Sequence, residues 1–340
     1  MDEVRPGSLV DEQALEVLHT SVACTKQPKV VVIACGGAGT NILRKAQEIR
    51  RKYHEDIPYH VVDCSQADLL TQLPCPTTIH KIGELGSGKN RELNRGAIEK
   101  YIRIKEKELI GLCGDITILL FSSAGGSGAV IAELLTEKLL QDPAKAVVHV
   151  TVFSDISKQD CMNTISSLKA MSQITKNDSY YVPVIPFYNP SNINGVHAYK
   201  DIEAVNAVAA TKVTCLIDLM TNHQIAALDI NDKVTALRPC RFKGSVSPNG
   251  HWQMDIGCSR NEIDMERGSE IHTILLSGYE PSEIDLLPNT FYPAKGGALK
   301  MVAVIGYPLE SKMLLALKKA KERHDASRPN DSSVSVDEIF

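Results

Sequence analysis

The sequence predicts an α/β protein with a doubly wound parallel sheet, followed by a smaller α+β domain. Three observations support this prediction. Short apolar runs alternate with longer helix-favouring segments between Lys29 and Tyr188, which is typical of a parallel sheet with a helix after each strand. Glycine-rich stretches follow three of these runs, and ligands of such sheets bind where the strands end. From Pro239 onward, short strands, turns and prolines replace the alternation, so we expect the smaller domain there.

The composition is that of a globular protein with one large or two ordinary domains. The chain has 340 residues, 43% hydrophobic and 23% charged, with a net charge of −4, so no electrostatic signal favours a direct nucleic-acid partner. Its beginning lacks the apolar stretch of a secretory signal, and no segment approaches the roughly 18 apolar residues of a membrane span. The nine cysteines lack metal-ligand spacing. We therefore expect a cytoplasmic protein with reduced thiols, no membrane partner and no metal site built from its own side chains.

Apolar and β-branched runs predict the strands. Those of the main sheet are Lys29–Ala34, Tyr59–Asp63, Thr77–Ile82, Ile116–Phe121 and Ala146–Phe153. A further strand, Tyr181–Tyr188, contains Pro183 and Pro186. Because proline has no N–H to donate to a neighbouring strand, we expect this strand at an edge or a strand end rather than at the sheet centre. In the smaller domain, Gly244–Gly257 is hairpin-like and Met301–Ile305 is a strand.

Helix-favouring segments separate and follow these strands. The predicted helices are Val10–Val22, a helix opened by Cys35–Asn41 and running to about Lys52, Arg91–Leu109, Ala129–Leu140, Met162–Lys176, Ala198–Asn222 and Leu309–Arg323. The elements together predict six parts. These are an N-terminal helical arm (1–26), the main domain (27–197), a central helix with the loop after it (198–233), the α+β domain (234–308), a C-terminal helix (309–326) and an acidic tail (327–340).

The chain is organised around Ile116–Val130, a buried strand that runs through small residues into a helix. Its Ala124–Gly128 stretch points successive backbone N–H groups at the start of the helix, where the helix dipole adds partial positive charge. Glycines permit close approach of an anion such as phosphate. Gly36–Asn41 and Gly86–Asn90 follow other predicted strands in the same way. A lone glycine cluster also occurs in turns that bind nothing, but three at one sheet edge favour a phosphate site.

Two known kinds of nucleotide site fit part of this pattern. Gly37–Gly39 follows a strand and Asp63 comes 24 residues later, as in NAD-binding oxidoreductases, but Ile42 stands in place of the third glycine. Gly83–Lys89 satisfies the GxxxxGK motif of P-loop NTPases, but Asn90 stands where a hydroxyl should meet the magnesium ion. Each interpretation leaves the other glycine loops unexplained.

A third interpretation places all three loops around one di- or triphosphate. In this order, Lys29–Asp232 resembles the tubulin/FtsZ superfamily, whose signature is a small residue, Gly-Gly-Thr-Gly, another small residue and Gly. Here the signature is Ala124–Val130, with Ser127 keeping the hydroxyl and Val130 replacing the last glycine. Together with Gly86–Arg91, these departures are most similar to the divergent phage tubulins of the PhuZ type. Plasmid-segregating proteins of the TubZ type are the nearest alternative.

The resemblance implies a GTP site, with GTP or GDP and Mg²⁺ as its cofactors. It implies that Gly86–Asn90 senses the γ-phosphate, that Asp160 and Asn163 lie at the ribose, and that Asn206 and Asn189 lie at the guanine base. An amide both donates to and accepts from the guanine edge, although each Asn is also an ordinary cap or turn residue. The residues assigned to GTP in this way are Gly36, Gly37, Ala38, Gly39, Thr40, Asn41, Gly86, Ser87, Gly88, Lys89, Asn90, Ala124, Gly125, Gly126, Ser127, Gly128, Asp160, Asn163, Asn189 and Asn206.

Asp229 and Asp232 match the family's acidic loop after the central helix, in the form Leu-Asp-x-x-Asp. The resemblance implies that these carboxylates are catalytic and orient the attacking water in the site of the next subunit; the alternative is two solvated loop acids. A head-to-tail contact of this kind does not close and generates an open filament. The implied function is a GTPase that assembles into dynamic filaments, which in phages position replicating phage DNA in the host cytoplasm.

The C-terminal tail, Ser327–Phe340, has too little apolar content to fold alone. It ends in apolar residues mixed with two acids and follows a helix rich in lysine and arginine. We expect it to dock on the neighbouring subunit of a homopolymer, and the alternative is a solvated extension.

Overall fold

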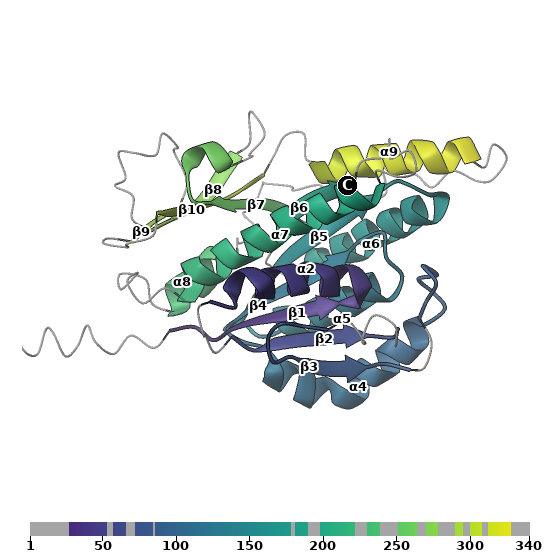
Figure 1. Ribbon diagram of the computed structural model, residues 1–340, viewed down its shortest axis with the longest axis horizontal. Coiled ribbons are helices and arrows are strands. Elements are labelled where there is room, and N and C mark those ends of the chain that lie inside the picture. Colours follow the sequence, from purple (N-terminus) through teal and green to yellow (C-terminus); the bar gives the residue numbers. More distant parts are fainter. Residues whose placement is uncertain are drawn as a thin grey trace, which may run out of the picture.

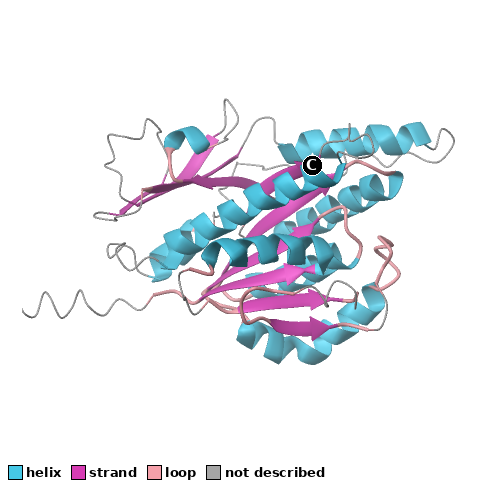
Figure 2. Ribbon diagram, in the orientation of Figure 1, coloured by secondary structure: helices cyan, strands magenta, loops and turns pink. Residues whose placement is uncertain are grey.

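The computed structural model describes residues 27–52, 57–65, 72–83, 86–177, 181–189, 198–221, 230–238, 251–263, 270–277, 290–294, 300–307 and 312–327. These residues form a ten-stranded sheet with helices on both faces, as Figures 1 and 2 show. The predicted α/β class with a mostly parallel sheet is confirmed. The predicted N-terminal helix Val10–Val22 and the tail after Ser327 lie outside the described residues.

The first six strands are parallel and form the larger part of the sheet. They are β1 (Val30–Cys35), β2 (Tyr59–Asp63), β3 (Thr78–Lys81), β4 (Ile116–Ser122), β5 (Ala146–Ser154) and β6 (Val182–Asn189). Their order across the sheet is β3-β2-β1-β4-β5-β6. The chain therefore builds outward in one direction from β1 and in the other from β4. Ligands of doubly wound sheets bind at such a switch point, outside the carboxyl ends of the strands.

The helices cover the two faces unequally. They are α2 (Gly36–Arg50), α4 (Arg95–Leu112), α5 (Ser127–Leu140), α6 (Lys158–Asn177), α7 (Ala198–Thr221), α8 (Ile230–Ala236) and α9 (Lys312–Ser327). In Figure 1, α2 and α7 lie side by side over one face, while α4, α5 and α6 cover the other. The C-terminal helix α9 packs along α6. Both faces of the central strands are therefore shielded from water.

Strand β1 shows how the sequence pattern produces this burial. Its side chains alternate between the two apolar clusters, with Val30, Val32 and Ala34 in the α2–α7 cluster and Val31, Ile33 and Cys35 in the α4–α5 cluster. All six residues are buried. A strand covered on both faces needs apolar residues at every position, because successive side chains point to opposite faces. This is why continuous apolar runs predicted the central strands correctly.

The last four strands continue the same sheet. They are β7 (His251–Gly257), β8 (Glu270–Ser277), β9 (Thr290–Ala294) and β10 (Met301–Tyr307), in the order β7-β10-β8-β9, with a short 3₁₀ helix at Arg260–Glu262. Strand β10 pairs antiparallel with β7 and β8, while β9 pairs parallel with β8. Of the predicted hairpin-like segment, residues 244–250 lie outside the described residues. The described remainder, β7, finds its partners in β6 and β10.

The expectation that Tyr181–Tyr188 suits an edge or a strand end better than the sheet centre is wrong as to the edge, because β6 pairs with β5 on one side and with β7 on the other. The pairing with β7 covers only Val182–Val184, so Pro186 lies beyond it, whereas Pro183 lies within it opposite Trp252. The short ladder to β7 therefore accommodates Pro186 but does not explain Pro183.

Helix α7 is the most apolar of the long helices. Its segment Asp201–Thr221 has a mean hydropathy of 1.3 over 18 residues and is long enough to cross a membrane by length and composition. The expectation that no segment reaches this level is therefore wrong. The helix is a core helix in this fold, with residues such as Ala209, Val213 and Leu216 fully buried against the sheet, and core helices of soluble proteins pass the same test.

Candidate functional site

A cavity of about 520 Å³ opens at the carboxyl ends of β1 and β4, the switch point of the sheet. This volume lies within the range of small-molecule sites. The predicted site residues that line it are Gly36, Gly37, Ala38, Gly86, Ser87, Gly88, Lys89, Ala124, Gly125, Gly126, Ser127, Gly128, Asp160 and Asn189. All three glycine-rich loops thus converge on one cavity. Sequence analysis did not assign Cys35, Asp63, Ser65, Ser122, Ser154, Ile156 and Ile202 to this site, although they also line it.

Two helices begin at this cavity. Helix α2 starts at Gly36 and α5 at Ser127, and neither of the preceding residues, Cys35 and Gly126, caps its helix with its side chain. A helix N-terminus carries partial positive charge and N–H groups without helical partners. Two of them directed at one cavity favour a polyanionic ligand such as a nucleotide phosphate chain.

Close packing explains the glycines at two of these positions. Gly36 has a φ of +74°, and a Cβ there would lie 2.9 Å from the Cα of Gly128. A Cβ on Gly126 would lie 2.1 Å from Ser87 Oγ, which accepts a hydrogen bond from the Ser127 N–H at 3.2 Å. The first and second loops therefore both touch the signature loop, and a side chain at these glycines would push them apart.

Asn163 holds two of the loops together instead of lining the cavity. Its buried Nδ2 donates to the carbonyl of Lys89 at 2.8 Å and to that of Ala124 at 3.0 Å. It therefore has a structural role here, and its predicted position at the ribose stays untested. The Asn90 side chain forms local hydrogen bonds, because its Oδ1 accepts from the backbone N–H groups of Glu92 and Leu93 at 3.1 Å each.

The remaining predicted residues of α2 lie away from the cavity. Gly39 lies against β4, since a Cβ there would lie 2.1 Å from the carbonyl oxygen of Leu120. The buried Thr40 hydroxyl donates to the Gly36 carbonyl at 3.0 Å, and Asn41 is exposed. None of these three is among the described residues that line the cavity.

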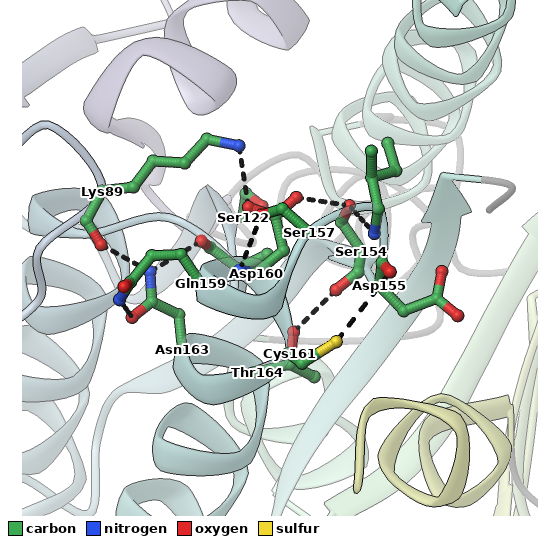
Figure 3. Close-up of polar contacts among 12 residues, drawn as sticks. Lys89, Ser122, Ser154, Asp155, Ser157, Gln159, Asp160, Cys161, Asn163 and Thr164 are labelled. Atoms are coloured by element: carbon green, nitrogen blue, oxygen red, sulfur yellow. Dashed lines mark hydrogen bonds and ion pairs between the residues drawn. The ribbon is translucent and has the colours of Figure 1, made fainter. Parts of the chain in front are cut away.

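One ion pair crosses the cavity. The ammonium nitrogen of Lys89, from the second loop, lies 2.7 Å from Oδ1 of Asp160 at the start of α6. Ser154 donates its hydroxyl to the other carboxylate oxygen of Asp160 at 3.0 Å. The Asp160 N–H donates to Ser157 Oγ at 3.1 Å, which caps the helix. Figure 3 shows these side chains gathered around the Asp160 carboxylate.

A buried ion pair lies behind the second loop. Arg91 pairs with Glu133 of α5, and both side chains are only 4% exposed. Arg91 also donates to Ser167 Oγ at 2.9 Å, and Ser167 in turn donates to the Ser123 carbonyl at 3.0 Å. Burial raises the pKa of Glu133, while Arg91 opposes that rise. This network ties the second loop to α5 and α6, and sequence analysis did not identify it.

The far side of the cavity is bounded by Ile156, by Asn189 at the end of β6 and by Ile202 of α7. Asn206 is buried one turn further along α7 and is not among the described residues that line the cavity. Asp63 ends β2, and its Oδ1 accepts from the N–H groups of the next two residues, at 2.6 and 3.1 Å. It was recognisable in the sequence as an acid ending a strand.

Of the two predicted catalytic acids, the structure describes only Asp232, which lies beyond the other end of α7. Asp229 lies outside the described residues, and Asp232 is half-buried in the first turn of α8. Ile202 of α7 lines the cavity, and the 24 residues of α7 span about 36 Å. Figure 1 shows α8 at the end of α7 that lies opposite the carboxyl ends of β1 and β4. Asp232 therefore does not reach the cavity of its own subunit.

Comparisons with known proteins agree with this arrangement. The chain matches no family model. It is 27% identical over 214 residues to a phage tubulin-like protein of Pseudomonas phage 201phi2-1, an alignment that covers 62% of this chain and 61% of that protein. Solved structures of a PhuZ201 filament (TM-score 0.64, 18% identity, 90% of this chain and 94% of that one) and of the phage tubulin PhuZ with GDP (TM-score 0.67, 18% identity, 91% and 95%) have the same fold.

The fold is that of the tubulin/FtsZ superfamily. Within it, the similarity in sequence and structure is to phage tubulins, as the signature loop and the second loop predicted. The sequence alignment spans about 61% of the length of the phage relative. In this chain the cavity at β1 and β4 and the acid on α8 lie at opposite ends of the long central helix α7.

Proposed function

We propose that this protein is a GTPase that assembles head to tail into dynamic filaments. The observation that carries the proposal is the placement of the phosphate-binding cavity and Asp232 at opposite ends of α7. In a head-to-tail filament, α8 of one subunit faces the cavity of the next. Hydrolysis then depends on assembly, because the acid that orients water comes from the neighbour. The structures similar to this chain include a PhuZ201 filament and a GDP complex.

The donor set around the cavity suits a magnesium nucleotide. Asp63 and Asp160 are the carboxylates among the described lining residues, and no group of three metal-binding side chains occurs in the part of the chain that the structure describes. Mg²⁺ usually keeps several waters and binds through phosphate oxygens with at most one or two carboxylates. The cavity therefore fits Mg²⁺ carried by GTP, with the ion neutralising phosphate charge.

Guanine selectivity is tested by competition binding. We expect GTP to bind well ahead of ATP, because Asn189 at the cavity and Asn206 on α7 are amides suited to the guanine edge. Tight binding of NAD in place of GTP would contradict the proposal. Light scattering with GTP, GDP and a slowly hydrolysed GTP analogue then separates a dynamic filament from a nucleotide-binding protein without polymers.

The role of Asp232 is tested by Asp232→Ala. GTP binding should stay intact, hydrolysis should fall by about 10²–10⁴-fold, and filaments should persist instead of turning over. Asn231→Ala is the matched control, because Asn231 is the exposed neighbour on the same helix and carries no charge. Wild-type phosphate release by Asp232→Ala would assign water orientation to another residue, with Asp229 the next to replace.

In a phage, such filaments would position replicating phage DNA in the cytoplasm of the host; in a plasmid-borne setting they would segregate DNA, as TubZ-type proteins do. The relatives of this chain by sequence include two phage tubulin-like proteins, which favours the phage role. Fluorescent fusion protein in infected cells is the test, and filaments that do not displace phage DNA would contradict it.

A further inference from the structure

Two cysteines from distant parts of the chain meet beside the central helix. The Sγ atom of Cys215, on α7, lies 3.9 Å from the Sγ atom of Cys258, the residue after β7, and the two are 43 positions apart in sequence. Both are free thiols in this structure. The sulfur atoms of a disulfide are about 2.05 Å apart, so these two have to approach by only about 2 Å to form one.

Hydrogen bonds hold the two backbone segments against each other. One helical turn before Cys215, the Lys212 ammonium donates to the carbonyls of Ile256 and Glu262, at 2.6 and 3.1 Å. The Cys258 N–H donates to Oε2 of the same Glu262 at 2.9 Å. The segment that carries Cys258 is therefore fastened to α7 on the side of Cys215. Because the two thiols are already positioned, little further entropy is lost when a bond forms between them.

The two thiols differ in their access to solvent. Cys258 is exposed, whereas Cys215 is only 7% exposed. Burial raises the pKa of Cys215 to about 12, so this thiol stays protonated at neutral pH, and the fold shields it from dissolved oxidants. Reaction with a molecule from solution therefore starts at Cys258. An accessible thiol with a second thiol within reach is the arrangement that thiol–disulfide exchange requires.

We propose that Cys215 and Cys258 are a reversible redox site, at which a low-molecular-weight disulfide such as oxidised glutathione converts the two thiols into a disulfide bond. The Cys258 thiolate attacks one sulfur of the small disulfide, which forms a mixed disulfide and releases one small thiolate. Cys215 then gives up its proton and attacks Cys258 Sγ, which forms the bond between the two cysteines and releases the second small thiolate. The two cysteines are oxidised, the small disulfide is reduced, and the two protons pass to the released thiolates.

The bond joins α7 covalently to the antiparallel part of the sheet, because β7 pairs with β10. It closes the loop between residues 215 and 258 and thereby restricts the unfolded chain, which favours the folded state. In reducing surroundings both residues stay thiols, so the bond forms only when the surroundings become oxidising. The inference does not depend on the proposed GTPase function.

The test is incubation of the full chain in glutathione buffers that range from mostly reduced to mostly oxidised, followed by alkylation and peptide mapping by mass spectrometry. In the oxidised buffers we expect the peptides of Cys215 and Cys258 to be recovered joined to each other, and to separate again after addition of dithiothreitol. The oxidised chain should also unfold at a higher temperature than the reduced chain. If Cys258 stays a mixed disulfide with glutathione, or if both thiols stay free in the most oxidised buffer, the inference is wrong.

Three variants make the result specific. Cys258→Ser should abolish both the joined peptides and the rise in unfolding temperature. Cys215→Ala should stop at the mixed disulfide on Cys258, because the first step needs only the exposed thiol. Cys75→Ser is the matched control, since Cys75 is a half-buried thiol that donates to the Gln47 carbonyl, and it should behave as the wild-type chain does. An equal rise in unfolding temperature in Cys258→Ser would assign the effect to other cysteines and overturn the inference.

Discussion

Lys233 is a fully buried lysine next to the proposed catalytic acid. Its Nζ donates to the carbonyl of Met220 at 2.8 Å and to Oε1 of Gln27 at 2.9 Å. Met220 lies in the last turn of α7, where carbonyl groups are left without helical partners. Lys233 therefore fastens α8 to the end of α7, and with it the position of Asp232.

Burial lowers the pKa of Lys233 from 10.5 to about 8. Between about pH 8 and pH 10.5, the Lys233 side chain is therefore protonated in the unfolded chain and deprotonated in the folded chain. The free energy of unfolding should therefore rise with pH through this window. Below about pH 8, the full cost of burying the protonated ammonium group reduces the stability of the folded chain. The total change is at most about 3 kcal/mol.

Urea unfolding at pH 7, 8.5 and 10 checks this prediction against Lys233→Met, which removes the titrating group and keeps the apolar stem. As the pH rises, the free energy of unfolding of the wild-type protein should increase relative to that of the variant. Because both proteins share every other titrating group, the difference isolates Lys233. A difference that is constant from pH 7 to pH 10 would show that Lys233 keeps an ordinary pKa.

Helix α2 depends on a glycine for its close approach to the sheet, in addition to its buried Ile42, Leu43 and Ala46. Gly39 lets the helix backbone approach β4, since its Cβ would lie 2.1 Å from the Leu120 carbonyl oxygen and 3.3 Å from the Cα of Ala34. Neither neighbour is a flexible side chain that can move aside. The start of α2, which forms one wall of the cavity, is therefore positioned by backbone contact.

Gly39→Ala should destabilise the protein by about 1–3 kcal/mol or more, because the added methyl group has no room. It should also weaken GTP binding, since α2 must shift. Gly96→Ala on α4 is the matched control. A Cβ there meets nothing within 4 Å, so this substitution should add up to about 1 kcal/mol of helix stability. Thermal unfolding of both variants is the measurement, and equal effects would contradict the packing argument.

At the scale of the whole molecule, α9 packs beside the cavity. Arg323 lies 3.5 Å from the buried carboxylate of Asp155 and donates to the Ile156 carbonyl at 3.4 Å. Lys319 lies over the ring of Tyr188, 5.5 Å from its centre. Ile156 lines the cavity. Helix α9 therefore packs against residues at the rim of the cavity.

Deleting Asp331–Phe340 should leave the fold and monomeric GTP binding unchanged and raise the critical concentration for assembly several-fold. GTP hydrolysis should fall with it, because the site is completed between subunits. The effect should shrink as salt is added, since exposed ion pairs are screened within about 8–10 Å at physiological ionic strength. Pelleting assays at low and moderate salt are the measurement. If the critical concentration is unchanged at both salt concentrations, the tail is a solvated extension that does not contribute to assembly.

Local patterns in the sequence determined the six strands of the parallel part of the sheet, the helices between them and the three glycine-rich loops at one end of these strands. Continuous apolar runs such as that of β4 are buried on both faces wherever they lie in the sheet. Glycines before a helix build an anion site from backbone groups alone. Both signals act within about ten residues of the chain, so they can be recognised without knowing which strands are neighbours.

Only the tertiary structure decided which residues meet. Lys89 and Asp160 are 71 residues apart in sequence and share an ion pair across the cavity. Arg91 and Glu133 are buried together behind the cavity. Asn163 connects the second loop to the signature loop through its hydrogen bonds to Lys89 and Ala124. Strand β6 lies inside the sheet despite its prolines, with β5 on one side and a three-residue ladder to β7 on the other. These partners depend on the order of the strands and on how closely the loops pack, and spacing along the chain encodes neither.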